Sequence, residues 1–265
     1  MVESQLSAIA LFRLVNSIRH ARHIVVLTGA GVSAESGIPT FRDALTGLWA
    51  HFDAERLATK NAFREDPARV WGWYEWRRMK VMRNQPNPAH RSIAALARHT
   101  PRLTVITQNV DNLHERAGST DVLHLHGSLF KPRCFACARP HALAADIPDE
   151  PEDGRALEPP RCSHCRGRVR PGVVWFGEPL PCTEWQAALA TVAQEECDVF
   201  LSIGTSSLVY PAAELPLKAH RRGAVVVQIN AAPTPLDEFA DYSLRGPAGK
   251  LLPQLLKFAW EQTDF

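Results

Sequence analysis

Short apolar runs alternate along this chain with segments whose apolar residues recur at helical spacing. The runs have the length and β-branched content of buried strands, and they occupy residues 23–27, 102–107, 121–126, 198–203, 224–229 and 242–244. Helical periodicity covers residues 6–18, 183–196 and 212–221, and a last helix ends at residue 260. Strands that alternate with helices predict an α/β fold built on a parallel, doubly wound sheet.

A helical insert interrupts this alternation between residues 44 and 100. Asp66 and Pro67 predict the start of a helix, because aspartate caps the first free amides and proline fits the first turn. Residues 85–88 end that helix and cap the next one, over residues 89–98. Tyr74 and Arg77 share one face of the first helix. Spacing alone favours a half-buried tyrosine beside a solvated arginine.

A glycine turn follows the first strand. Residues 29–34 read G-A-G-V-S-A and fit the pattern G-x-G-x-x-[G/A], in which the backbone closely approaches a pyrophosphate at a helix N-terminus. A plain strand-to-helix turn explains the glycines equally well. A dinucleotide-binding turn usually continues into a helix, a second strand and an acidic residue that binds the ribose. This chain lacks that continuation, because Pro39 stops a regular helix and places Phe41 and Arg42 on a loop.

Polar residues follow the next two strands. Gln108, Asn109 and Asp111 come directly after residues 102–107, where an open α/β sheet binds its ligands. They could equally be turn and helix-cap residues. His124 and His126 lie on one face of the third short strand, so spacing cannot choose between them.

Two C-x₂-C pairs predict a metal-binding module. Cys134, Cys137, Cys162 and Cys165 would complete a tetrahedral Zn²⁺ site, which is structural because four thiolates leave no open position. The insert at residues 146–160 is acidic and proline-rich and predicts a surface loop. A solvated basic patch is expected, in preference to a nucleic-acid site, at Arg161, Arg166, Arg168 and Arg170.

Composition narrows the class of protein. The chain has 265 residues and a net charge of +2, which gives no general case for nucleic acid or an anionic membrane as partner. No apolar run approaches the ~18 residues of a membrane span, and no export signal is visible. Six cysteines without such a signal favour a reducing compartment, so a cytoplasmic location is expected. Cys182 and Cys197 lack metal-ligand spacing and are predicted to be core or cap residues.

The motifs together resemble the sirtuins, the NAD-consuming protein deacylases. The resemblance rests on G-A-G-V-S-A-E-S-G-I-P-T-F-R-D at residues 29–43, T-Q-N-V-D at 107–111 and H-G-S at 126–128. It continues through the paired C-x₂-C motifs, V-V-W-F-G-E at 173–178, G-T-S-S at 204–207 and Asn230. It implies a Rossmann-like NAD-binding domain from residues 1–43, 101–128 and 171–265, a helical insert at 44–100 and a small zinc-ribbon domain at 129–170.

The resemblance also assigns roles to residues. His126 is the implied general base, and His114 and His124 are structural. Phe41 would shield the reaction from water, and Arg42 would help hold the loop that carries both residues. NAD is consumed as lysine is released with O-acyl-ADP-ribose. The implied NAD contacts are Gly29, Ala30, Gly31, Ser33, Ala34, Glu35, Thr40, Phe41, Arg42, Gln108, Asn109, Val110, Asp111, Gly204, Thr205, Ser206, Asn230 and Ala248.

The Tyr-x-x-Arg pair is similar to one that marks the sirtuin branch acting on succinyl- and malonyl-lysine. Arg77 would bind the carboxylate of such an acyl group and Tyr74 would donate a second hydrogen bond. The resemblance further implies that the protein substrate pairs as an extended strand with residues 173–178, where Val173 and Phe176 line the lysine tunnel. Mono-ADP-ribosyl transfer, plain deacetylation and a non-enzymatic NAD-sensing or zinc-ribbon module remain the alternatives.

Overall fold

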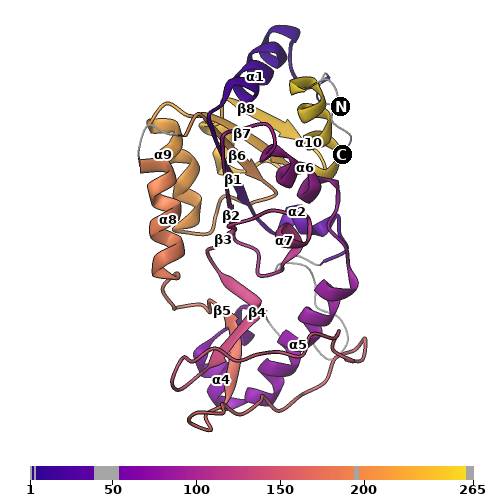
Figure 1. The fold of residues 1–265 in the computed structure, drawn as a ribbon, viewed down its shortest axis with the longest axis vertical. Coiled ribbons are helices and arrows are strands. Elements are labelled where there is room, and N and C mark those ends of the chain that lie inside the picture. The colour runs from indigo at the N-terminus through magenta and orange to yellow at the C-terminus, as the bar shows by residue number, and fades with distance from the viewer. Residues whose placement is uncertain (1, 3, 39–53, 194–196, 261–265) are drawn as a thin grey trace.

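A six-stranded parallel sheet forms the centre of the larger of two lobes (Figure 1). A computed structural model describes residues 2, 4–38, 54–193 and 197–260 of the chain. The sheet has the order β3-β2-β1-β6-β7-β8. Its strands are β1 (His23–Thr28), β2 (Arg102–Thr107), β3 (Leu123–His124), β6 (Val199–Ile203), β7 (Val225–Asn230) and β8 (Tyr242–Arg245). The predicted parallel, doubly wound sheet is therefore confirmed, with the strand order of a dinucleotide-binding domain.

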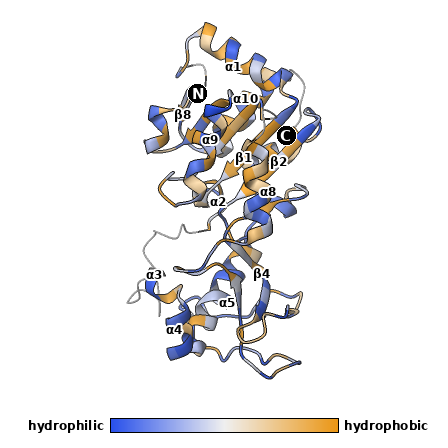
Figure 2. Ribbon diagram, turned by 90° about the vertical axis from the view of Figure 1, so that its left-hand side faces the viewer, coloured by the Kyte–Doolittle hydropathy of each residue, from blue (hydrophilic) through white to orange (hydrophobic). Residues whose placement is uncertain are grey.

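Helices cover both faces of this sheet. All six residues of β1 are buried, and successive side chains enter opposite cores. One core receives α1 (Ala8–His20), α6 (Pro88–Leu96) and α10 (Ala248–Ala259). The other receives α8 (Cys182–Ala193) and α9 (Leu215–Arg221). Figure 2 shows the hydrophobic residues of β1 and β2 running through the middle of the larger lobe.

Several elements differ from their predicted bounds. The predicted strand at residues 121–126 is only the two-residue β3. The predicted helix at 212–221 begins as a 3₁₀ turn, η2 (Ala212–Glu214), before α9. Helix α8 begins at Cys182, and residues 194–196 of its predicted range lie outside the described residues. Helix α6 belongs to the predicted helical insert at residues 44–100, but it packs in the core of the larger lobe, against α10.

The short remaining elements connect these parts. They are α2 (Ala30–Ala34), α7 (Leu113–Arg116) and η3 (Pro235–Glu238). The smaller lobe contains α3 (Ala54–Leu57), α4 (Lys60–Glu65), α5 (Pro67–Arg83) and an antiparallel pair, β4 (Gly127–Cys134) with β5 (Val169–Val173).

One hydrophobic core unites the helical insert with the metal-binding module. Phe63 and Trp73 from the helices pack with Leu129 and Trp175 from the other side. Helix α5 begins as predicted, since the Asp66 side chain accepts a hydrogen bond from the Arg69 amide at 2.9 Å and Pro67 occupies the first turn.

The segment at residues 146–160 is a largely exposed loop, as its composition predicts, but it is also held against a helix. It lies along the outside of α5, where the Trp76 indole donates to the Glu152 carbonyl at 3.0 Å and the Leu157 amide donates to the Ala68 carbonyl at 2.9 Å. The Glu152 carboxylate pairs with Lys80 and Arg83. These backbone and indole contacts could not be read from an acidic, proline-rich composition.

Gly72 makes this close approach possible. A Cβ atom there would lie 2.0 Å from the Arg155 carbonyl oxygen. We expect Gly72→Ala to lower the free energy of unfolding by about 1–3 kcal/mol because the segment must move away from α5. Chemical denaturation measures this change. Alanine stabilises an unobstructed helix by up to ~1 kcal/mol over glycine, so a gain in stability would contradict the predicted clash.

The predicted basic patch needs a correction at one residue. Arg161, Arg166 and Arg168 are exposed, but Arg170 is only 3% exposed. Its guanidinium forms an ion pair with the Glu178 carboxylate. The partner lies on a separate segment that the local cluster of arginines did not reveal.

Candidate active site

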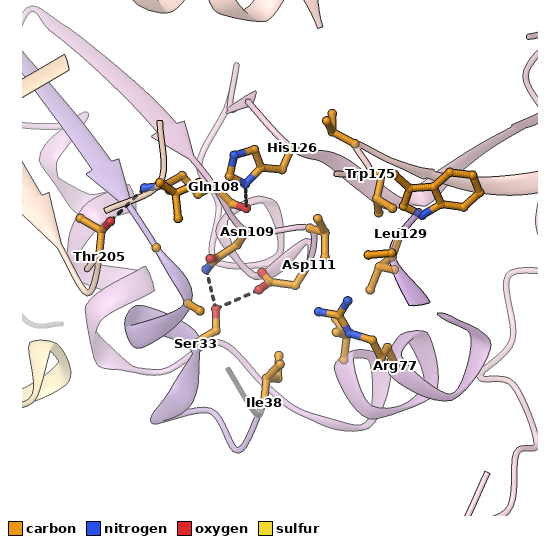
Figure 3. Close-up of a pocket in the computed structure, with 18 of the residues that line it drawn as sticks. Ser33, Ile38, Arg77, Gln108, Asn109, Asp111, His126, Leu129, Trp175 and Thr205 are labelled. Atoms are coloured by element: carbon orange, nitrogen blue, oxygen red, sulfur yellow. Dashed lines mark hydrogen bonds between the residues drawn. The ribbon is translucent and has the colours of Figure 1, made fainter. Parts of the chain in front are cut away.

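A cavity of about 580 Å³ lies where the two lobes meet, at the carboxyl ends of the central strands (Figure 3). The larger lobe contributes the loops after β1, β2, β6 and β7. The smaller lobe contributes α5 and residues 173–178. The predicted site residues that line the cavity are Gly29, Ala30, Gly31, Ser33, Tyr74, Arg77, Gln108, Asn109, Val110, Asp111, His126, Val173, Phe176, Gly204, Thr205, Ser206 and Asn230.

The glycine turn after β1 packs closely on the turn after β6. The Gly31 amide donates to the Gly204 carbonyl at 2.8 Å. Gly204 has a φ of +61°, and a Cβ atom there would lie 2.4 Å from the Val32 nitrogen. Glycine is therefore required where the two turns meet. Both turns line the cavity and present backbone to it.

A buried hydrogen-bond network follows β2. The Ser33 hydroxyl accepts from the Asn109 amide at 3.0 Å and donates to the Asp111 carboxylate at 2.9 Å (Figure 3). Burial raises the pKa of Asp111, and hydrogen bonds from the Leu113 amide and Ser33 oppose that shift. The network holds an amide and a carboxylate in fixed positions on the cavity wall.

The structure distinguishes the two histidines that spacing could not. Only His126 lines the cavity, and its Nδ1 lies 2.9 Å from the Gln108 carbonyl oxygen. Because a carbonyl can only accept, Nδ1 carries the proton of the neutral ring and Nε2 keeps a lone pair. Burial lowers the pKa of His126, partly offset by the Gln108 hydrogen bond. These features suit a general base.

His124 and His114 have other partners. His124 Nε2 lies 2.6 Å from the Glu115 carboxylate, and its Nδ1 lies 3.2 Å from the Asn109 carbonyl oxygen. His114 Nε2 lies 2.9 Å from the buried Thr28 hydroxyl. Both rings pack away from the cavity lining and link neighbouring elements of the fold.

Tyr74 and Arg77 lie on the cavity side of α5. Tyr74 is fully buried, and its hydroxyl accepts a hydrogen bond from the Trp175 indole at 3.1 Å. Burial raises the pKa of Tyr74 to about 12, with Arg77 opposing, so the hydroxyl keeps its proton. Burial lowers the pKa of Arg77, while Tyr74 and Asp111 partly offset that shift. Figure 3 shows the Arg77 guanidinium directed into the cavity. The arginine is therefore not the solvated side chain that spacing alone favours.

Some predicted NAD contacts do not line this cavity. Ala34, Glu35 and Ala248 are absent from its wall, and the Glu35 carboxylate instead accepts a hydrogen bond from the Gly249 amide at 2.8 Å, in the first turn of α10. Thr40, Phe41 and Arg42 lie outside the described residues.

The cavity also contains residues that the sequence reasoning missed. Lys80 and Val81 could have been found from helical spacing, because they lie three and four residues after Arg77. Val209 and Tyr210 carry no comparable local signal. Ile38 and the remaining residues of the predicted 173–178 segment also line the cavity, and the residues that were missed are Ala58, Trp76, Lys80, Val81, Leu129, Leu180, Val209 and Tyr210.

The four cysteines form a separate metal centre. Their sulfur atoms all lie within 4.8 Å of one another. Cys134 and Cys165 have sulfurs 3.4 Å apart, and Cys137 and Cys162 have sulfurs 3.8 Å apart. A tetrahedron with Zn–S bonds of 2.3 Å has edges of about 3.8 Å, so the donor set fits a structural zinc ion. Cys197 is buried, and Cys182 begins α8. No helix in the described part of the chain is long and apolar enough to cross a bilayer.

Comparisons with known proteins agree with this geometry. The sequence pattern of the Sir2 family matches residues 29–211. An NAD-dependent protein deacylase from Methylococcus capsulatus is 63% identical over 92% of this chain and 95% of its own.

Two solved structures extend the similarity to the fold. A Sir2 homologue in complex with NAD superposes with a TM-score of 0.83 at 46% identity, covering 94% of both chains. A Sir2 complex with a p53 peptide and NAD⁺ superposes with a TM-score of 0.79 at 28% identity, covering 94% of this chain and 98% of the other.

Proposed function

Because this chain belongs to the Sir2 family, we propose that it is a deacylase that prefers lysine carrying succinyl or malonyl groups and also removes acetyl groups. NAD-dependent protein deacylation is its activity, and NAD is the co-substrate. The finer preference depends on one observation: Tyr74 and Arg77 stand together in the wall of a largely apolar pocket.

The chemistry of an acidic acyl group suits this pair. A succinyl or malonyl chain ends in a carboxylate, which is costly to bury without a partner. The Arg77 guanidinium can bind it with two parallel hydrogen bonds, and the protonated Tyr74 hydroxyl can donate another. A hydrogen bond to a charged group contributes about 1.5–3 kcal/mol, or roughly ten- to hundredfold in preference.

We assign the larger-lobe half of the cavity to NAD. The Gly29–Gly31 turn and the Gly204–Ser206 turn would hold phosphate and ribose oxygens, and Asn230 would hold the adenosine ribose. The Ser33, Asn109 and Asp111 network would orient the nicotinamide end. Bound NAD supplies the ribose carbon that receives the acyl oxygen as nicotinamide leaves.

His126 is assigned as the general base for this reaction. Its Nε2 would remove the proton of a ribose hydroxyl, while the Gln108 carbonyl holds the ring through Nδ1. Because burial keeps the imidazole neutral, the base is available at neutral pH. The predicted roles of Phe41 as a shield against water and of Arg42 in holding its loop remain part of this proposal.

The protein substrate is proposed to bind as an extended strand beside residues 173–178. The amides of Val174, Trp175 and Phe176 already donate to acceptors in this chain. A substrate strand would therefore pair with carbonyl groups of this segment or with the Gly177 amide. Exposed apolar side chains at the cavity mouth, Phe176 and Tyr210, support docking of a peptide there.

Arg77→Met tests the acyl preference. With matched peptides, we expect the variant to lose about ten- to hundredfold of its kcat/KM for succinyl-lysine and to keep or gain activity on acetyl-lysine. Mass spectrometry follows both products and free nicotinamide.

Arg69→Met is the matched control, since Arg69 lies at the exposed start of α5 and pairs with Asp66. Equal activity of the parent on both acyl groups, with no change in Arg77→Met, would leave a plain deacetylase. Radiolabel that stays on protein would indicate ADP-ribosyl transfer instead.

A further inference from the structure

A buried ion pair joins Glu178, which lines the cavity, to Arg170. Arg170 Nη1 and Nη2 donate to the two oxygens of Glu178 at 2.6 and 3.0 Å, in a bidentate arrangement. The side chains are only 4% and 7% exposed. Burial alone would raise the pKa of Glu178, but hydrogen bonds from Arg170 and the Trp175 amide lower it to about 2. Glu178 is therefore ionised at neutral pH.

Both members of the pair hold Trp175. The Glu178 carboxylate accepts from the Trp175 amide at 2.9 Å, and Arg170 donates to the Val173 carbonyl at 2.9 Å. The Arg170 guanidinium carbon also lies 3.4 Å from the centre of the Trp175 indole ring. The ring of Phe63 packs against the same indole, with 5.4 Å between the two ring centres. Backbone and ring are thus held together, and Trp175 is only 1% exposed.

The indole in turn holds the Tyr74 hydroxyl. Its N–H donates to the tyrosine oxygen at 3.1 Å, across 101 residues of sequence. A phenol oxygen that accepts from the indole keeps its own O–H for another acceptor. The rotation of that O–H is restricted by the indole donor, so its direction depends on where the Trp175 ring stands.

We propose that Trp175, Arg170 and Glu178 are positioning residues for acyl-group specificity, in which the ion pair fixes the indole and the indole N–H aims the Tyr74 hydroxyl at the acyl carboxylate. This inference rests on the proposed function of Tyr74 and Arg77. It adds residues outside the Tyr-x-x-Arg pair itself. Acetyl-lysine has no carboxylate, so its reaction does not depend on this hydroxyl.

A double-mutant cycle tests the proposal with the variants Trp175→Phe, Tyr74→Phe and their combination. The measured quantity is the ratio of kcat/KM for succinyl-lysine to that for acetyl-lysine. We expect Trp175→Phe to lower this ratio about tenfold, mainly through KM for the succinyl peptide. In the Tyr74→Phe background, the same change should leave the ratio unaltered, because the group it positions is gone.

Two further variants distinguish a positioning role of Trp175 from a packing role. Trp71→Phe removes an indole from the same helix-rich lobe at a buried site outside the cavity lining, and it should leave the ratio unchanged. Trp175→benzothienylalanine keeps both fused rings and replaces only the N–H by sulfur. It should reproduce the tenfold fall even if Trp175→Phe folds poorly.

The outcomes distinguish this inference from the function on which it rests. If Tyr74→Phe and Arg77→Met leave the ratio unchanged, the acidic-acyl function fails and the inference fails with it. If Tyr74→Phe and Arg77→Met lower the ratio but neither Trp175 variant does, the inference alone is overturned. Equal losses on both acyl groups, or additive effects in the cycle, would likewise reduce Trp175 to a packing residue.

Discussion

His126→Asn is expected to lower NAD-dependent deacylation by about 10²- to 10⁴-fold. Asparagine can keep a hydrogen bond to the Gln108 carbonyl, but its amide cannot accept a proton near neutral pH. The loss should appear in kcat more than in the KM values, because the imidazole acts on the reacting ribose. Steady-state kinetics on an acyl-lysine peptide, with nicotinamide release as readout, measures it.

The pH profile adds an independent check on His126. Burial places its pKa below the usual 6.5, so kcat/KM for NAD should rise with pH through a value below 6.5 and be level above it. His20→Asn, on the exposed end of α1, is a control that should retain both rate and profile. A full rate with His126→Asn would remove the assignment of this residue as the base.

Removal of the metal from the four-cysteine site should unfold much of the smaller lobe. Structural zinc contributes about 10–16 kcal/mol of binding free energy in small zinc modules, which exceeds the stability of most domains. The module shares one hydrophobic core with α5, so its loss should also displace Tyr74 and Trp175. Deacylation should therefore be lost even though no cysteine lines the cavity.

Tryptophan fluorescence follows this unfolding because Trp73, Trp76 and Trp175 are buried in the smaller lobe. Treatment with a zinc chelator, or Cys134→Ser with Cys162→Ser, should expose these rings and release one zinc ion per chain. Cys182→Ser provides the control, since Cys182 is exposed and remote in sequence from the four ligands. An unchanged melting temperature and spectrum after complete loss of zinc would contradict a structural role.

The sequence by itself determined the features that depend on neighbouring residues. Buried strands, helix periodicity and the cap at Asp66 are local, and all are present in the structure. The order of strands and helices then restricted the sheet to a parallel, doubly wound form. The two C-x₂-C pairs likewise predicted their own cluster, because each pair forms a local turn that presents two sulfurs.

Tertiary structure alone decided the features that join distant segments. It brought His126 rather than His124 to the cavity. Strand β3 ends at His124, so the chain has left the sheet at His126, where the Gln108 carbonyl after β2 holds the imidazole ring. It buried Arg170 against Glu178 and carried the Trp175 indole to Tyr74. Neither composition nor periodicity specifies such pairs, since each depends on how two separately folded segments pack. The loop along α5 shows the same limit: its residues are polar, yet backbone groups and a glycine hold it against the helix.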